Sequence, residues 1–368
     1  MSTASANRTR FAGVLAATLV LTTGIAGAGT DAAAPGSRPA PSAAPAPAPA
    51  RVTSAWLPHW GGEAAYQDAL AHAAQLHTVS PFWYQATSET TIAPHPGAGD
   101  QRIVEGFHSR GIKVVPTVTE TLDARAMADL LNDPTRRTAH VDTLVRLAES
   151  PGYDGVDLDY ERMAETDDED LRGQVRLGYN TLASELCRRL HTIGKQCVVT
   201  VLPYTRDSGH AYDYAHLGGV VDRLRIMGYN LHHAEGAPGP LSSLAWYDEF
   251  LRHATNAVPV DRIEVALPAY GWDWTVGSTD RAKHLTTLEA EALRLDKKAT
   301  YRLDPESGTP HFTYVDQGHT HEVWYQDAKG VAAHLAIMRT HGVRGSGLWA
   351  LGFEDPALWG VLAEGWER

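Results

Sequence analysis

The sequence predicts an α/β fold, a closed (β/α)8 barrel of the TIM type with a small α+β insertion between strands seven and eight. From residue 51 onward, short apolar runs alternate with amphipathic helical patterns, and this alternation is typical of a parallel sheet. Eight such runs occur in one chain, the number that closes a barrel. No glycine-rich dinucleotide fingerprint follows the first run, so the sequence does not favour an open nucleotide-binding sheet.

The predicted strands are short apolar runs separated by helical patterns. They cover residues 53–57, 78–84, 112–118, 155–160, 197–203, 224–229, 263–270 and 343–351. Among the predicted helices, residues 171–193 show the clearest apolar spacing of three to four residues. More than 70 residues separate the last two strands, far more than one helix requires. Within this gap, residues 275–325 contain a helical pattern at 285–295 and strand-like pieces at 299–303, 311–315 and 322–325, which predict the insertion.

The first 50 residues differ in composition from the rest of the chain. Two arginines precede an apolar stretch over residues 11–25, and residues 26–28 are small, so residues 1–28 are predicted to be a secretory signal peptide. The apolar stretch is shorter than the roughly 20 residues that span a bilayer. Residues 29–50 are rich in Ala and Pro and are predicted to form an extended linker. The barrel therefore occupies residues 51–368, and we expect a secreted or cell-wall-associated protein with no membrane span after signal removal.

The charge and the cysteine content exclude several classes of function. The formal net charge of -12 argues against a nucleic acid or an anionic membrane as partner, because either needs a basic patch. The two cysteines do not form a zinc motif, and we expect no metal. Cys187 and Cys197 lie late on the long helix and at the start of the fifth strand, which makes them candidates for a disulfide in an exported protein. The sequence leaves their pairing open.

The fourth predicted strand carries carboxylates at alternate positions. Because side chains along a strand alternate between its two faces, Asp157, Asp159 and Glu161 are predicted to face the barrel interior, and Val156 and Leu158 the helices. Burial and like-charge repulsion raise carboxyl pKa values, so the cluster should keep a proton near neutral pH. That property suits a general acid at the C-terminal end of a barrel strand. A solvated edge or a calcium site fits less well, since apolar residues are strictly interleaved and calcium takes its oxygens from loops.

At these residues the chain resembles glycoside hydrolase family 18, the chitinase-type family. The D-G-x-D-x-D-x-E signature of that family is complete, with its acids at Asp154, Asp157, Asp159 and Glu161. Residues 227–230 are similar to the family's M-x-Y-D motif, with Asn230 in place of the acid, and Trp349 stands where the family places the Trp floor of its sugar site. Residues 80–84, 267–274 and 322–328 resemble the spore-cortex peptidoglycan hydrolases and their relatives. The chain departs from these relatives in two respects: it has no LysM repeat, and residues 115–118 replace the family's S-x-G-G motif.

The resemblance implies substrate-assisted, retaining hydrolysis of glycans that contain β-1,4-linked N-acetylglucosamine, an exception to the two-carboxylate rule. Glu161 would protonate the glycosidic oxygen, and the 2-acetamido carbonyl of the substrate would attack the anomeric carbon. Asp159 would hold the acetamido N–H and stabilise the oxazolinium ion, with Asp157 sharing its proton. Tyr229 would donate a hydrogen bond to the acetamido carbonyl. The resemblance implies no cofactor.

Aromatic side chains at the strand ends are predicted to stack on sugar rings. The candidate substrate-binding residues are Trp349, Asn230, Tyr204, Tyr270, Trp272 and Trp83. We expect a monomer whose partner is a polysaccharide or oligosaccharide containing N-acetylglucosamine, while chitin, peptidoglycan and N-glycan cores all stay open as substrates.

Two other functions fit parts of the sequence. Some relatives of family 18 are inactive sugar-binding lectins, but those usually lack the acid that Glu161 supplies here. A barrel hydrolase with two catalytic carboxylates needs a second acid at another strand end, for which Glu120 and Asp273 are the candidates.

Overall fold

The computed structural model describes residues 51–150, 152–206 and 210–364. The predicted signal peptide at 1–28 and the predicted linker at 29–50 lie outside the described residues. Within the described ranges, no helix combines the length and the apolar composition that crossing a membrane requires.

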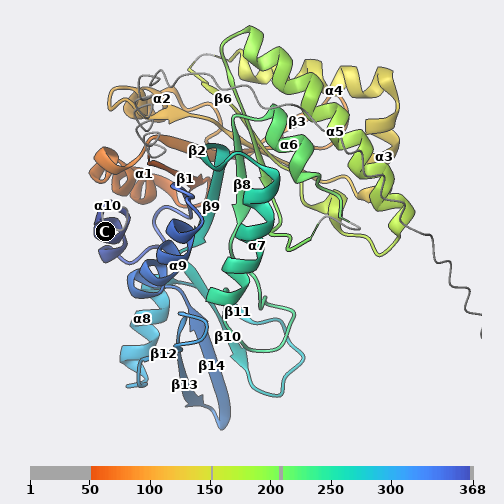
Figure 1. The fold of residues 1–368 in the computed structure, drawn as a ribbon. Helices are drawn as coiled ribbons and strands as arrows, with labels where there is room; N and C mark the ends of the chain where they lie inside the picture. Colours follow the sequence, from red (N-terminus) through yellow and green to blue (C-terminus); the bar gives the residue numbers. More distant parts are fainter. Residues whose placement is uncertain (1–50, 151, 207–209, 365–368) are drawn as a thin grey trace, which may run out of the picture. The chain divides into compact units, whose positions relative to one another are not determined.

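Eight parallel strands close into a barrel, which confirms the predicted fold class (Figure 1). The order around the barrel is β1, β2, β5, β6, β7, β8, β9 and β15, and β1 pairs with both β2 and β15, which closes the sheet. These strands span Val52–Pro58, Thr78–Ala86, Thr117–Glu120, Gly155–Asp159, Gln196–Val201, Arg223–Met227, Ile263–Pro268 and Gly345–Trp349. Two short strands, β3 (Ile92–Pro94) and β4 (Lys113–Val114), pair with β2. The predicted third strand is thus split into β4 and β5, since Pro116 between them has no N–H to donate.

Helices cover the outside of the barrel (Figure 1). They are α1 (Gly62–Ala71), α2 (Gln101–His108), α3 (Ala124–Asn132), α4 (Pro134–Ala148), α5 (Glu169–Thr192), α6 (Tyr214–Val220), α7 (Leu244–Ala257), α9 (Ala328–Thr340) and α10 (Ala357–Glu364), with 3-10 turns η1 (Ala73–Gln75), η2 (Arg162–Ala164) and η3 (Val260–Arg262). The longest, α5, begins where the Asp168 side chain accepts the N–H of Leu171, and its predicted apolar face is buried from Leu171 to Leu186, while Ile193 lies beyond the helix and is exposed. A Cβ at Gly178 of this helix would stand 2.5 Å from Leu131 Cβ, so glycine allows the close packing of α5 on α3.

The predicted insertion is a five-stranded antiparallel sheet with one helix. Its strands, in the order β11, β10, β14, β13 and β12, span Lys283–Thr286, Tyr270–Thr275, His319–Tyr325, Pro310–Asp316 and Arg302–Leu303. Helix α8 (Thr287–Asp296) covers one face around a small core that includes Phe312 and Tyr325. The insertion begins earlier than predicted, because the seventh predicted strand ends in the barrel at Pro268 and the chain enters the new sheet at Tyr270.

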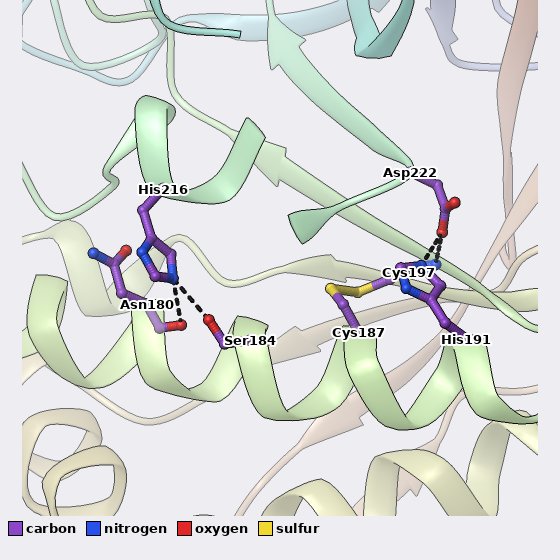
Figure 2. The surroundings of a disulfide bond; sticks show 7 residues. All are labelled: Asn180, Ser184, Cys187, His191, Cys197, His216 and Asp222. Carbon is purple, nitrogen blue, oxygen red and sulfur yellow. Dashed lines mark hydrogen bonds and ion pairs between the residues drawn. A yellow bond between two sulfur atoms is a disulfide. The ribbon is translucent and has the colours of Figure 1, made fainter. Parts of the chain in front are cut away.

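Cys187 on α5 and Cys197 on β7 form a disulfide, with Cα atoms 5.1 Å apart (Figure 2). Beside it, the Asp222 carboxylate accepts the N–H of Cys197 at 2.7 Å and lies 2.9 Å from His191 Nε2. The disulfide therefore ties the end of α5 to the beginning of β7. This position is at the N-terminal end of the barrel strands, opposite the strand ends that carry barrel active sites.

Candidate active site

The interior face of β6 carries two of the three predicted acids. Asp157 is fully buried and Asp159 is 5 % exposed, whereas Val156 and Leu158 belong to the apolar core. Strand β6 ends at Asp159, so Glu161 lies beyond the strand on the turn into η2, with helical backbone angles. The alternation along the strand thus accounts for two acids, and the third reaches the site from a turn.

Asp157 is closely surrounded by hydrogen-bond donors at the centre of the barrel. The donors are Trp56 Nε1 at 3.2 Å, Thr117 Oγ1 at 2.9 Å and Arg225 Nη1 at 2.9 Å on Oδ2, and Thr200 Oγ1 at 2.8 Å on Oδ1. They come from four different strands, β1, β5, β8 and β7. The expected sharing of a proton between Asp157 and Asp159 stays a prediction.

Asp159 lies two residues further along the same face, with far fewer partners. Its Oδ1 is buried and has no hydrogen-bond partner among the described residues. Burial raises the pKa of Asp159 well above its usual range, and repulsion from Glu161, Asp157 and Glu120 adds to the shift. Asp159 is therefore set to carry a proton, and one of its buried oxygens has no hydrogen-bond partner among the described residues.

Glu161 lines the cavity described below and is partly exposed to it. Burial raises the pKa of Glu161 to about 7, with a further contribution from the Glu165 carboxylate. A carboxyl with this pKa is protonated in a large fraction of molecules at neutral pH, as a general acid must be.

Glu120, at the end of β5, fixes the turn that carries Glu161. Its Oε2 accepts the N–H of Glu161 at 3.1 Å, and its Oε1 accepts the N–H of Met163 at 2.9 Å. The side chain is 4 % exposed and does not line the cavity. Burial raises the pKa of Glu120 to about 7 despite these backbone hydrogen bonds. Glu120 thus positions the acid and is not a second acid facing the substrate.

A cavity of about 590 Å³ opens at the C-terminal ends of the barrel strands. It is lined by Trp60, Glu161, Leu202, Met227, Tyr229, Asn230, Tyr270, Trp272, Arg281, His284, Thr286, Glu289, Trp349 and Phe353. The barrel strand ends and the turns after them supply Trp60, Tyr229 and Trp349, and the insertion supplies Tyr270, Trp272, Arg281, His284 and Glu289. The cavity has the mixed aromatic and polar lining that suits a sugar chain.

One side of the cavity is a group of hydrogen-bonding side chains after β8. Asn230 adopts a positive φ of 65°, which Asn tolerates better than most residues. Its Oδ1 accepts hydrogen bonds from Tyr270 Oη at 2.6 Å and Trp272 Nε1 at 3.4 Å. Burial raises the pKa of Tyr229, with further contributions from Tyr270 and Asp159, so its hydroxyl stays protonated and able to donate.

The prediction that Trp83 binds substrate is wrong, because this side chain lies in the core. It is 2 % exposed and packs against Tyr153 in the core. Adjacent residues on a strand face opposite sides, and the neighbour Phe82 faces the site, with its ring centroid 5.2 Å from that of Trp349. Trp60, which is 53 % exposed, joins Trp349 in the cavity wall. The aromatic side chains that approach Trp349 from this side are therefore Trp60, two residues after β1, and Phe82 on β2.

The other predicted binding residues divide into two groups. Trp349, Asn230, Tyr270 and Trp272 line the cavity together. Tyr204 does not line it: the ring stacks on His210 at 3.6 Å and lies beside Tyr214. Sequence reasoning missed Arg225, Arg281 and His284. The one signal in the sequence for Arg225 is a charged residue inside the apolar predicted strand 224–229.

The described residues contain no cluster of three or more His, Cys, Asp or Glu side chains that could hold a metal ion. Asp273, the other candidate for a second catalytic acid, accepts hydrogen bonds from Tyr314 Oη at 2.7 Å and lies 3.0 Å from His321 Nδ1. Both partners belong to the insertion sheet, so Asp273 is a structural acid of that sheet.

Comparisons with known proteins identify the family of the chain. The family described as glycosyl hydrolases family 18 matches residues 101–354. A cortical fragment-lytic enzyme of Bacillus subtilis is 26 % identical over 303 residues, covering 78 % of this chain and 68 % of that protein.

Solved structures share the fold. A chitinase from Chromobacterium violaceum superimposes with a TM-score of 0.78 at 24 % identity, over 87 % of this chain and 100 % of that one. The spore cortex-lytic enzyme of Bacillus cereus superimposes with a TM-score of 0.75 at 24 % identity, over 86 % of this chain and 75 % of that one.

Proposed function

This chain belongs to family 18 of the glycosyl hydrolases, and from that premise we propose that it hydrolyses β-1,4 bonds of N-acetylglucosamine glycans by substrate-assisted, retaining catalysis. The family establishes a glycosidase acting on glycans that contain N-acetylglucosamine. What we propose beyond the family is the role of each residue and the identity of the bond that is cleaved.

The proposed reaction begins with proton transfer from Glu161 to the glycosidic oxygen. As the bond between that oxygen and the anomeric carbon breaks, the acetamido carbonyl oxygen attacks the anomeric carbon from the other face. The product of this step is a cyclic oxazolinium ion and a free sugar hydroxyl. Glu161, now ionised, then takes a proton from water, and the water oxygen attacks the anomeric carbon as its bond to the carbonyl oxygen breaks, which regenerates the 2-acetamido group and restores the original configuration.

The observation that carries the proposal is the unpaired oxygen of Asp159 next to Glu161. Asp159 Oδ1 is buried and has no partner among the described residues, so its side chain can turn to accept the acetamido N–H without losing a hydrogen bond of that oxygen. Tyr229 lines the cavity together with Glu161 and can donate its hydroxyl to the acetamido carbonyl. Together these groups orient the carbonyl as nucleophile and stabilise the positive charge that follows.

A mechanism with two catalytic carboxylates has weaker support. Glu289 also lines the cavity, but its Oε2 accepts the N–H of Thr286 at 2.8 Å as part of the cap of α8. The Glu289 side chain therefore caps the N-terminus of α8.

The substrate class is tested with one panel of glycans: purified peptidoglycan, chitin oligomers and an N-glycosylated protein, with products identified by mass spectrometry. We expect fragments that end at N-acetylglucosamine from peptidoglycan or chitin. The relatives named above include a cortical fragment-lytic enzyme and a chitinase, so both substrates belong in the panel. Binding without any product would instead support the alternative of an inactive sugar-binding lectin.

We also propose that the protein is exported, on the basis of the predicted signal peptide at residues 1–28. Expression of the full chain with its N-terminus, followed by sequencing of the N-terminus of protein in the culture medium, tests this. A cleaved product in the medium is expected, and a product retained in the cells with Met1 or the intact leader would contradict it.

A further inference from the structure

Two carboxyl groups outside the barrel interior join helix α1 to the turn that follows β15. Asp68 lies on α1, and Glu354 lies on the turn between β15 and α10. The Glu354 side chain is 4 % exposed, and Asp68 is half-buried. Asp68 Oδ2 and Glu354 Oε2 are both buried, and neither oxygen has a hydrogen-bond donor among the described residues. The two carboxyl groups nevertheless form a hydrogen bond with each other.

A hydrogen bond between two carboxyl groups requires a proton. An ionised carboxylate can only accept hydrogen bonds, so two ionised groups have no donor between them. Two such anions in contact also repel each other, and the repulsion favours the state in which one of them is protonated. The contact between Asp68 and Glu354 is therefore favourable only while the pair holds a proton.

Aromatic side chains cover the pair on the side of α1 and α10. Trp359 Nε1 of α10 donates to Glu354 Oε1 at 3.2 Å. The Trp359 ring stacks on His72, which follows α1, with ring centroids 4.5 Å apart. His72 Nδ1 lies 3.6 Å from Asp68 Oδ1 and donates to the Asp68 backbone carbonyl at 3.0 Å. The imidazole thus faces the outer oxygen of Asp68, and the inner oxygen is left to Glu354.

The other elements packed against Glu354 bring no cation to it. Asp327 at the start of α9 and Asp355 before α10 lie around the same small space as Glu354. Both carboxylates have backbone partners, because Asp327 Oδ1 accepts the N–H of Gly330 at 2.9 Å and Asp355 Oδ1 accepts the N–H of Ala357 at 2.9 Å. The remaining residues that line this space are uncharged: Pro268, Ala269, Thr287, Gln326, Ala328, Val331 and Leu358.

The surroundings of Glu354 delay its ionisation. Burial raises the pKa of Glu354 to about 8, and the hydrogen bond and the charge of Asp68 add to the shift. The backbone N–H groups of Glu354 and Gly352 act in the opposite direction and lower this pKa. The pair therefore keeps its proton at neutral pH and loses it in mildly alkaline solution.

The turn that carries Glu354 is also part of the cavity wall. Phe353 lines the cavity, and its backbone carbonyl accepts the N–H of Thr287 at 3.0 Å. Gly352 has a positive φ of 82°, and a Cβ at this position would stand 3.1 Å from Ala65 Cβ on α1. The turn therefore packs closely on α1, and the position of Phe353 depends on that contact.

We propose that Asp68 and Glu354 share one proton, and that this proton holds residues 350–356 against α1 and so fixes Phe353 in the cavity wall. When the proton is lost, the half-buried Asp68 carboxylate turns toward water, and the contact between the turn and α1 opens. Asp68 and Glu354 touch no substrate in this scheme and are positioning residues. The sharing of the proton is independent of the proposed function, and only its effect on glycan binding rests on that function.

The direct test is the titration of Glu354 in the folded protein. Protein labelled with ¹³C at the Glu carboxyl carbon is titrated by NMR, and the Glu354 signal is identified by its loss in Glu354→Gln. We expect a midpoint near pH 8. In Asp68→Asn the midpoint should fall by about one unit or more, because the amide can donate to the Glu354 carboxylate and does not repel it. A midpoint near the usual Glu value, or the same midpoint in Asp68→Asn, would overturn the proposal.

The second test is the pH dependence of the melting temperature. The folded pair binds a proton that the unfolded chain releases, so its contribution to stability falls as pH rises from about 4.5 to about 8. Glu354→Gln can donate an amide N–H to Asp68 and has no proton to lose. Between about pH 5.5 and 8.5 the wild type should therefore lose roughly 5 °C more than this variant. Asp355→Asn, which can still accept the N–H of Ala357, is the control and should keep the wild-type slope. Equal slopes in the wild type and Glu354→Gln would contradict proton sharing.

The effect on the cavity wall is measured as binding of a chitin oligomer by calorimetry, in a Glu161→Gln background that prevents turnover. Between about pH 7 and 9 the affinity should fall about threefold more in this protein than in the double variant that also carries Glu354→Gln. An equal fall in both would overturn the link between the pair and the cavity wall. If no glycan binds at any pH, the proposed function fails, whereas the NMR titration and the melting temperatures still decide whether Asp68 and Glu354 share a proton.

Discussion

The barrel interior has two regions that treat buried charge in opposite ways. In the lower region, toward the N-terminal ends of the strands, Asp157, Arg225 and Glu264 compensate one another through hydrogen bonds of 2.8–2.9 Å. In the upper region, Asp159 has an unpaired oxygen and Glu161 faces the cavity with a raised pKa. The two regions are only two residues apart along β6. The comparison teaches that a carboxylate whose oxygens all have hydrogen-bond partners holds the barrel strands together, whereas a carboxyl with an unpaired oxygen can still bind a ligand.

The largest expected effect is at the proton donor of the upper region. Glu161→Gln removes the proton that the leaving oxygen needs, so kcat should fall by about 10³-fold or more. Binding of a chitin oligomer should survive, because the aromatic wall is unchanged. Release of reducing sugar and calorimetric titration measure the two effects.

Glu169→Gln is the matched control, since it changes an exposed carboxylate at the start of α5 that does not line the cavity. It should retain most of the activity. Near-normal turnover in Glu161→Gln would refute the assignment of the acid.

The second-largest effect on activity is expected at Asp159, the carboxyl with an unpaired oxygen. Asp159→Asn keeps the shape but removes the carboxyl group that can ionise as the oxazolinium ion forms, so kcat should fall by about 10²-fold. Steady-state kinetics on a chitin oligomer measure the fall. Asp273→Asn, a buried acid of the insertion sheet, serves as control and should leave kcat unchanged. An unchanged rate in Asp159→Asn would contradict the proposed role of Asp159 in stabilising the oxazolinium ion.

A smaller effect is expected when a negative charge is introduced at Asn230 in the cavity wall. The alkaline limb of kcat/KM should lie near pH 7, because activity is lost as the Glu161 carboxyl ionises. Asn230→Asp adds an anion to the same cavity and disfavours that ionisation, so the limb should move to higher pH by about half a unit. A limb that moves to lower pH would contradict the assignment of Glu161 to it.

The smallest effect on activity is expected at the disulfide. Replacing both cysteines by serine should reduce the free energy of unfolding by about 3 kcal/mol, since a short closed loop is opened. The disulfide joins α5 to the N-terminal end of β7, so kcat at a temperature well below the melting point should not change. Calorimetric unfolding with and without reductant, alongside the rate, measures both. A matching loss of rate in folded protein would show that the two ends of the barrel are coupled.

The fold and the central acids could be predicted from local patterns. Strand alternation placed Asp157 and Asp159 on one face, and helical spacing found α5. Trp83 was assigned to the wrong face because its run is apolar on both sides, and alternation then gives no direction. Arg225 was missed because its partners Asp157 and Glu264 lie 68 and 39 residues away in the chain, and only closure of the barrel brings them together.

The central claim is that the acetamido group of the substrate is the nucleophile. The most direct measurement compares a chitin oligomer with its fully deacetylated analogue and follows the anomeric form of the first product by ¹H NMR. The account predicts a β-anomer from the acetylated oligomer and no detectable cleavage of the deacetylated one. Comparable rates on both, or an α-anomer as the first product, would contradict it.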